Sequence, residues 1–305
     1  MRAWCWLLPA WIVVVAAGAG GWLATAARPR IPDAAAADLE RGGDPERGRL
    51  IFAAGDCSSC HASPGQADRL RLGGGMDLPS PLGTFHPPNI SPDSEDGIGR
   101  WRTIDLANAL LAGISPDRQH YYPAFPYTSY AHMRLSDVKD LMAYLRTLPP
   151  VKGHAPAHDL PFPFTIRRLI GGWKLLFLDQ TVIEDDPARD PAWNRGRYLA
   201  EGVGHCAECH SARNLAQSIR HGTRFAGGID QSGVGYVPNI TPTGIGRWTR
   251  DDIAEALHTG RTPEHRQIGS TMADVVTNLS ALPDSDRRAI ATYLLSLPRR
   301  HSTDE

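Results

Sequence analysis

The sequence predicts an all-α protein of two similar domains in tandem, joined by a proline-rich connector and preceded by an apolar N-terminal segment. Three observations support this prediction. The 305 residues are 42% hydrophobic and 21% charged, which is enough apolar material for packed cores and excludes a disordered chain. A set of short motifs occurs twice in the same order, and helical apolar spacing follows each copy. The 25 prolines and 30 glycines predict many turns between the helices.

The N-terminal segment is uncharged from residue 3 to residue 27. As a helix this run would span ~37 Å, more than the ~30 Å of a membrane's hydrocarbon core. We therefore predict a transmembrane helix as a membrane anchor over residues 1–28, followed by a stalk over 29–44. Tryptophans near its ends resemble interfacial anchors: Trp4, Trp6 and Trp22. A cleaved signal peptide is the alternative, because Ala24-Thr25-Ala26 resembles a cleavage site. On either interpretation the rest of the chain is exported.

An internal duplication organises the rest of the chain. Each half carries a Cys-x-x-Cys-His motif, then Pro-Asn-Ile-Ser/Thr-Pro, then Gly-Ile-Gly-Arg-Trp. The first copies occupy residues 57–61, 88–92 and 97–101, and the second copies 206–210, 238–242 and 244–248. Chance does not explain so many matches in one order, so the halves are repeats. We assign domain 1 to residues 45–150, the connector to 151–190, domain 2 to 191–299 and a tail to 300–305.

Helices follow from the apolar spacing within each repeat. After Trp101 and after Trp248, apolar residues recur at helical intervals until Gly113 and Gly260, which we predict to end these helices. Each repeat then closes with a second helix that ends in a Leu-Pro pair. We predict side-chain caps at the start of these closing helices, from Ser136 or Asp137 in domain 1 and from Ser285 in domain 2. A short helix-like run, 166–178, lies in the connector, where we expect it to pack between the domains.

The two Cys-x-x-Cys-His motifs predict the chemistry. On a helix, residues three and four apart share a face, so both thiols of a pair and the following histidine point the same way. This spacing lets two sulfurs bond covalently to one haem while the histidine coordinates its iron. The residues are Cys57, Cys60, His61, Cys206, Cys209 and His210. We therefore predict two covalently bound haem c groups, in two class I cytochrome c-like domains. Cys5 lies outside both motifs.

Three other uses of such cysteine pairs fit less well. A thioredoxin-like pair would need a βαβ setting and has no need of the following histidine. Zinc ribbons usually keep their two pairs ~15–20 residues apart, and these pairs lie far further apart in the sequence. Disulfides form outside the cytoplasm, but closing so short a loop strains them.

The sixth ligand of each iron determines what the haem does. Methionine raises the reduction potential and closes the open position, as an electron carrier requires. In domain 2 the ligand is Met272, the only methionine after Cys206, which we place in a loop before the final helix. In domain 1 we favour Met133, which occupies the corresponding loop. Three rivals for this position remain: Met76, Met142, which we expect in the core of the closing helix, and His132.

Over residues 45–299 the sequence resembles the cytochrome c subunits of membrane-bound periplasmic dehydrogenases for alcohol, gluconate, sorbitol and related substrates. The resemblance rests on the strings at 72–75, 88–92, 97–101, 122–130 and 238–242. In that family the methionine shortly after the Tyr-Thr-Ser-Tyr string is an axial ligand, which implies this role for Met133. Many of these subunits carry three haem domains, whereas this chain has two, so functions of the third are not implied.

The resemblance implies a function in electron transfer. A periplasmic dehydrogenase would supply electrons, and a quinone or a soluble cytochrome feeding an oxidase would accept them. Substrate oxidation would belong to the partner, so we do not expect this chain to be an enzyme. We expect it at the bacterial inner membrane, with its haem domains facing the periplasm. The formal net charge of −1 argues against nucleic acid as a partner.

Two other functions fit a chain with two haems. One is a diheme cytochrome c peroxidase, an enzyme in which one haem keeps an open or displaceable site. The other is the anchored diheme subunit of a haem–copper oxidase complex. A methionine in each repeat counts against the peroxidase, and the partner that copurifies would distinguish the oxidase subunit from a dehydrogenase subunit.

Overall fold

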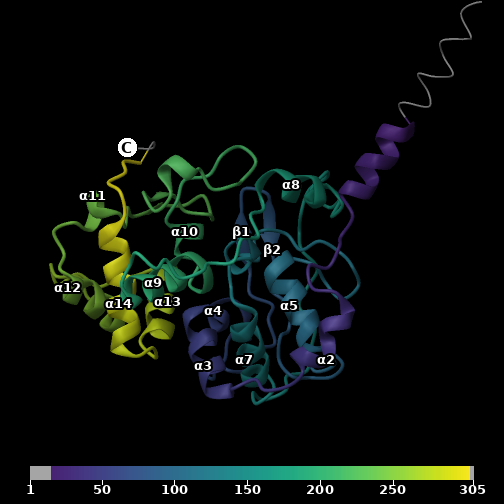
Figure 1. Cartoon of the computed structure of the whole chain (residues 1–305), viewed down its shortest axis with the longest axis horizontal. Coiled ribbons are helices and arrows are strands. Elements are labelled where there is room, and N and C mark those ends of the chain that lie inside the picture. The colour runs from purple at the N-terminus through teal and green to yellow at the C-terminus, as the bar shows by residue number, and fades with distance from the viewer. Residues whose placement is uncertain (1–14, 303–305) are drawn as a thin grey trace, which may run out of the picture.

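The computed structural model describes residues 15–302 and shows two helical halves side by side (Figure 1). Domain 1 contains α3 (Pro45–Ala54), α4 (Cys57–His61), α5 (Thr103–Ala112), α6 (Tyr127–Tyr130) and α7 (Leu135–Leu145). Domain 2 contains α9 (Pro191–Tyr198), the π-helical turn η2 (Leu199–Val203), α10 (Cys206–Cys209), η3 (His221–Thr223), α11 (Pro242–Ile245), α12 (Arg250–Thr259), α13 (Thr271–Leu279) and α14 (Asp284–Ser296). The helical prediction is confirmed, and one apolar core runs through both halves.

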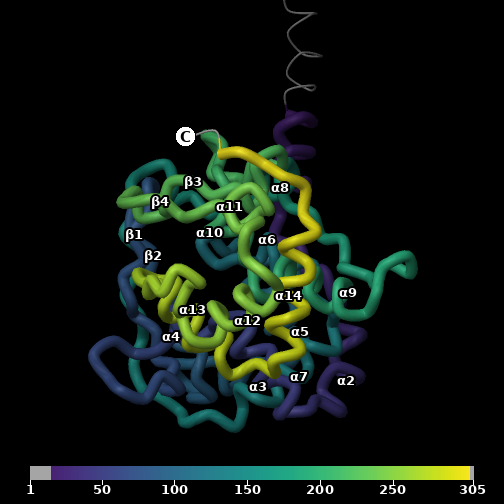
Figure 2. The backbone as a smooth tube through the Cα atoms, turned by 90° about the vertical axis from the view of Figure 1, so that its left-hand side faces the viewer, coloured from purple at the N-terminus to yellow at the C-terminus, as the bar shows by residue number. Residues whose placement is uncertain are grey.

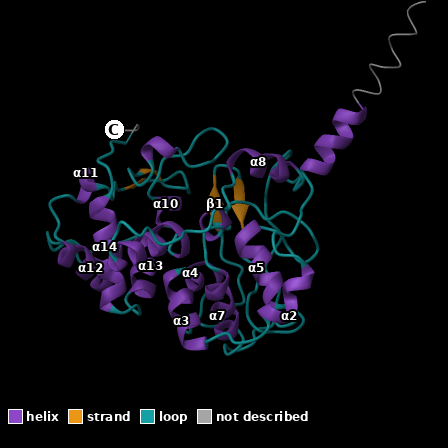
Figure 3. Cartoon of the chain, in the orientation of Figure 1, coloured by secondary structure: helices purple, strands orange, loops and turns teal. Residues whose placement is uncertain are grey.

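Strands are few in the described part of the chain (Figure 3). Each half adds one antiparallel hairpin between its Cys-x-x-Cys-His helix and its long middle helix. These pair β1 (Leu78–Ser80) with β2 (Gly83–Phe85), and β3 (Gly228–Ile229) with β4 (Tyr236–Val237). Neither hairpin is predicted by the sequence, because strands of two or three residues are too short to show alternation.

The first and last helices of each repeat cross at a glycine. In domain 1, α3 meets α7 at Gly48, where a Cβ atom would collide with the backbone carbonyl of Asp140. In domain 2, α9 meets α14 at Gly196, where a Cβ atom would collide with the carbonyl of Ala289. An ion pair flanks each crossing: Arg47 with Asp140 at 2.6 Å, and Arg195 with Asp286 at 2.7 Å. The two repeats therefore share their motifs and also the way in which the first and last helices pack on each other.

We expect Gly48→Ala to lower the free energy of unfolding by about 1–3 kcal/mol or more, because the new methyl forces two helix backbones apart. Chemical denaturation followed by circular dichroism measures this loss. Gly172→Ala is the matched control, since its methyl would meet only a side-chain carbon at 3.9 Å. Equal stability of the two variants would show that the crossing tolerates a side chain.

The predicted stops of the middle helices are confirmed. Both α5 and α12 end at a glycine in the left-handed conformation, Gly113 with φ 61° and Gly260 with φ 72°. Each glycine N–H donates to the last turn of its helix. At its start, α12 has a capping box, in which the Thr249 hydroxyl accepts from the Asp252 N–H and the Asp252 carboxylate accepts from the Thr249 N–H.

The predicted caps of the closing helices are wrong by two or three residues. Helix α7 begins after Arg134 and α14 begins after Pro283, and neither residue accepts a side-chain cap hydrogen bond. Acidic residues in the first turns, Asp137 and Asp284 among them, supply the favourable charge at the positive helix end instead.

The predicted N-terminal transmembrane helix is a further correction. Within residues 15–302 no helix combines the length and the apolar character that crossing a membrane requires. Residues 15–24 are helical and the helix stops there, so the described part rises ~15 Å, about half of a hydrocarbon core. The remainder of the predicted anchor, residues 1–14, lies outside the described residues.

The predicted stalk and the connector both pack on domain 1. In the predicted stalk, η1 (Asp33–Ala35) and α2 (Ala36–Leu39) follow Ile31, whose N–H and carbonyl bond the Asn108 side chain of α5. In the connector, α8 (Leu169–Phe177) contacts both halves (Figure 1). The Lys174 ammonium donates to the carbonyl of Gly113 at 2.7 Å, and the Trp173 indole donates to Ala216. The connector helix therefore packs between the domains, as predicted.

Candidate functional site

Both Cys-x-x-Cys-His motifs form short helices at equivalent places in the two halves. In α4 and in α10 the residue just before the first cysteine has a left-handed backbone, Asp56 with φ 53° and His205 with φ 39°. This sharp entry starts the helix at the first cysteine, so each cysteine pair lies on one helical face. The two cysteines of each pair form no disulfide with each other.

The histidine of each motif is held by a proline carbonyl from the next motif. His61 Nδ1 lies 2.8 Å from the carbonyl of Pro88, and His210 Nδ1 lies 2.8 Å from that of Pro238. A carbonyl only accepts, so the proton must sit on Nδ1, which leaves the Nε2 lone pair for a metal. Burial lowers the pKa of both histidines, which keeps the rings neutral, as coordination requires.

The prolines act as ligand-orienting residues, a role that the sequence analysis missed. The signal was present, because Pro88 and Pro238 each open a repeated Pro-Asn-Ile-Ser/Thr-Pro motif. The asparagine that follows secures the motif: Asn89 donates to the carbonyl of Val151 at 2.7 Å, and Asn239 to that of Arg300 at 2.8 Å. In both repeats the orienting loop is thus tied to the chain beyond the closing helix.

The cysteine environments fit thioether-forming sulfurs. Burial raises the pKa of Cys60 and of Cys206 to about 12, and it also raises that of Cys57. A zinc ligand or a redox-active dithiol needs a stabilised thiolate and a lowered pKa. A thioether carries no charge, so burial costs it little. Three of the four cysteines are half-buried and Cys209 is exposed, so sulfurs beside oriented neutral imidazoles are accessible for covalent attachment of haem.

The two predicted methionine ligands lie in different local structures. Met133 is 1% exposed and sits in a turn between α6 and α7. Met272 is half-buried in the first turn of α13, so the predicted loop there is a helix. Its helix was missed because Gly269 and Ser270 just before it read as loop. Met133 and Met272 as iron ligands remain predictions.

The rivals of Met133 are also placed. Met142 is buried in the core of α7, as expected, and Met76 is half-buried in the loop before β1. His132 is half-buried, and its Nδ1 lies 2.6 Å from the carbonyl of Thr181 in the connector. Met133 is thus buried in the core, whereas His132 is half-buried and bonded to the connector.

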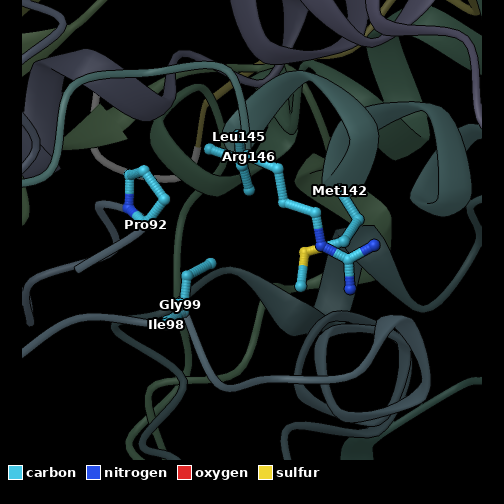
Figure 4. Close-up of a pocket in the computed structure, with 6 residues that line it drawn as sticks. All are labelled: Pro92, Ile98, Gly99, Met142, Leu145 and Arg146. Carbon is cyan, nitrogen blue, oxygen red and sulfur yellow. The ribbon is translucent and has the colours of Figure 1, made fainter. Parts of the chain in front are cut away.

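A cavity of about 250 Å³ lies in domain 1 between α7 and the Gly-Ile-Gly-Arg-Trp segment (Figure 4). Its lining residues are Pro92, Ile98, Gly99, Met142, Leu145 and Arg146. The Arg146 guanidinium is bound by Glu40 at 3.0 Å and by the carbonyl of Trp101. The lining is apolar apart from this arginine and includes no carboxylate or nucleophile.

The two haem-attachment loops pack against each other across the domain boundary. His205 Nε2 lies 3.3 Å from the carbonyl of Gly55, which also accepts from the Tyr130 hydroxyl at 3.0 Å. The rings of Tyr130 and His205 meet edge to face at 5.5 Å between centroids. Figure 2 shows the two attachment helices, α4 and α10, in the left half of the view. The sequence analysis identified both motifs but not this contact between them.

Comparison with known proteins agrees with this geometry. Residues 45–149 match the family model described as Cytochrome c. The chain is 50% identical to a diheme cytochrome c-type protein of Cereibacter sphaeroides, over 94% of this chain and 96% of that protein. It is 37% identical to the fructose dehydrogenase cytochrome subunit of Gluconobacter japonicus, over 83% of this chain and 52% of that subunit.

A further relative is the cytochrome c subunit of the quinone alcohol dehydrogenase of Gluconobacter oxydans, 36% identical over 83% of this chain and 54% of the subunit. The chain thus spans nearly all of the diheme relative but about half of these dehydrogenase subunits. The motifs, the helical fold and these relatives establish two covalently bound haem c groups. This chain belongs to the cytochrome c family, together with diheme c-type cytochromes and the cytochrome c subunits of alcohol, fructose and gluconate dehydrogenases.

Proposed function

We propose that this protein is the electron-transfer subunit of a dehydrogenase complex, with substrate oxidation carried out by a partner dehydrogenase. Each haem, when bound, takes up and releases one electron at its iron. The contact of the Gly55 and His205 loops carries the proposal, because it holds two attachment sites together inside one chain. Relatives named as cytochrome subunits of dehydrogenases support the choice of partner.

The protein's own residues serve this function by holding the haems, orienting the histidine ligands and covering the sixth position of each iron. His61 and His210 present Nε2 in one tautomer, because Pro88 and Pro238 occupy Nδ1. Met133, buried in the core, would close the sixth position and exclude water or other ligands. We propose Met272 for the same role in domain 2. With His61 and Met133 in one domain and His210 and Met272 in the other holding a haem, no open position would remain for a substrate.

The proposed location is the periplasmic face of the bacterial inner membrane. The uncharged run over residues 3–27 supports export of the domains. The acceptor that we propose is a quinone, or a soluble cytochrome that feeds an oxidase, which would link the dehydrogenase to the respiratory chain.

Purification of the native complex tests this function. We expect a tagged full-length chain to copurify with a dehydrogenase, and one substrate of that enzyme to reduce both haems. The assay adds alcohols, sugars and sugar acids separately and follows haem absorption. The control adds each substrate to the isolated cytochrome, which should stay oxidised. Copurification with an oxidase core, or turnover of peroxide by the isolated chain, would contradict the proposal.

A further inference from the structure

A buried carboxylate joins the second haem-attachment loop to domain 1. Glu208 lies between the two cysteines of α10 and is only 7% exposed. Its Oε1 accepts hydrogen bonds from the hydroxyls of Thr128 at 2.6 Å and Ser129 at 3.0 Å, both in α6 of domain 1. Its other oxygen, Oε2, accepts from Arg213 at 2.6 Å. Every strong contact of this carboxylate is therefore charge-assisted, and two of the three cross the domain boundary.

Burial of the Glu208 carboxylate costs free energy unless these hydrogen-bond partners are present. Arg213 supplies a positive charge and Thr128 and Ser129 supply hydroxyl donors, and these contacts compensate the burial of the carboxylate. A buried carboxylate that loses its donors keeps the desolvation cost without the compensation. The carboxylate therefore favours the arrangement in which α6 stays against α10.

Helix α6 leads directly into the predicted ligand of the first haem. The backbone N–H of His132 donates to the carbonyl of Ser129, and that of Met133 donates to the carbonyl of Tyr130, at 2.9 Å. On its other side, the Tyr130 hydroxyl is bound to Gly55 in the first attachment loop. The segment that carries Met133 is thus held between the attachment loops of both domains.

A matching contact runs in the opposite direction. Helix α13 begins next to Met272, and further along it Asn278 bonds the serine pair between the cysteines of α4. Its Oδ1 accepts from the Ser58 hydroxyl at 2.9 Å, and its Nδ2 lies 3.0 Å from the Ser59 hydroxyl. In both cases, residues between the two cysteines of one motif are hydrogen-bonded to the helix next to the predicted methionine ligand of the other domain.

We propose that Glu208 is a positioning residue that acts across the domain boundary to hold Met133 in place as the sixth ligand of the first haem. The inference rests on the proposed role of Met133 and goes beyond it, because it assigns the strength of ligation in one domain to a residue of the other. Glu208 belongs to domain 2 and is not itself a proposed ligand of the iron in domain 1. It acts through Thr128 and Ser129.

Competition with imidazole measures how firmly the methionine is held. In the Met272→Ala background the second haem is open and binds imidazole first, so the remaining titration reports the first haem. We expect Glu208→Ala to tighten imidazole binding at the first haem about tenfold, which corresponds to ~1.4 kcal/mol, near the value of a hydrogen bond to a charged group. The absorption band of methionine-ligated ferric haem should weaken in parallel.

Conservative variants separate the effect of the hydrogen bonds that Glu208 accepts from the effect of its charge. Glu208→Gln keeps an acceptor oxygen for the two hydroxyls but loses the charge that pairs with Arg213, so its shift should be clearly smaller than that of Glu208→Ala. Thr128→Val removes one donor with little change of shape and should shift affinity in the same direction as Glu208→Ala. Glu255→Ala removes an exposed carboxylate on α12 and should change nothing.

Two results would overturn the inference. One is wild-type imidazole affinity in Glu208→Ala. The other is an equal shift in Glu208→Gln and Glu208→Ala, which would mean that only the charge matters. A Met133→Ala variant keeps this outcome distinct from the ligand assignment. If Met133→Ala leaves the first haem closed to imidazole, the proposed ligand is wrong. If it opens that haem while Glu208→Ala does not, only the positioning role fails.

Discussion

The double variant Cys206→Ala/Cys209→Ala should carry one covalent haem per chain instead of two. The two sulfurs of a motif are the covalent links, and His210 alone cannot hold a haem through denaturation. Haem absorption per mole of denatured protein and the mass of the intact chain both measure this loss. The same substitutions at Cys57 and Cys60 should remove the other haem and leave the second.

Cys5→Ala is the matched control for these variants, because this cysteine belongs to neither motif. It should retain two covalent haems. A haem content of two in Cys206→Ala/Cys209→Ala would contradict attachment at this motif, and loss of both haems would show that the domains cannot mature independently. The packing of the His205 loop on Gly55 makes the stability of the remaining domain worth measuring in the same samples.

Replacement of the axial methionines should have the second large effect. We expect Met133→Ala and Met272→Ala each to lower the reduction potential of one haem on the order of 100 mV, a fraction of the ~0.8 V range that axial ligands set. A thioether favours the ferrous iron, and its loss favours the ferric state. Spectroelectrochemical titration of the purified full-length chain gives both potentials.

Met142→Leu is the control for the methionine series, because it conserves volume in the core of α7 and should leave both potentials in place. If Met133→Ala changes neither potential while Met76→Leu changes one, the ligand of domain 1 is Met76. If His132→Ala changes the potential of the first haem and Met133→Ala does not, the iron of the first haem is held by two histidines. Unchanged potentials in both Met133→Ala and Met272→Ala would refute the ligand assignment in both domains.

Local features of the fold were predicted well. The stops at Gly113 and Gly260 are confirmed, because a left-handed residue after a helix is a property of the glycine itself. Helix starts were predicted less well. Several residues near a start can serve as a cap, and the chain before Leu135 and Asp284 decides among them. The helix around Met272 was also missed, because Gly269 and Ser270 just before it indicated a loop. Tertiary contacts outweigh such a weak local preference.

The transmembrane prediction failed because it inferred the length of a helix from the absence of charged residues. An uncharged run indicates what a segment can do in a bilayer, but not how much of it is helical. In the structure, the helix over residues 15–24 is followed by Thr25, whose carbonyl lies 3.0 Å from Nε2 of His120 in domain 1. Arg168 of the connector stacks on Trp22, 4.1 Å from its ring. Contacts with domain 1 and the connector thus surround the end of this helix.

By itself, the sequence determined the two haem-attachment motifs, their histidines and the duplication that contains them. These follow from spacings of three and four residues, which helical geometry converts directly into one shared face. Only the tertiary structure decided what orients and joins the two sites. Pro88 lies 27 residues from His61, and Thr128 lies 80 residues from Glu208. Contacts at such separations depend on how the whole chain packs, and no local spacing encodes them.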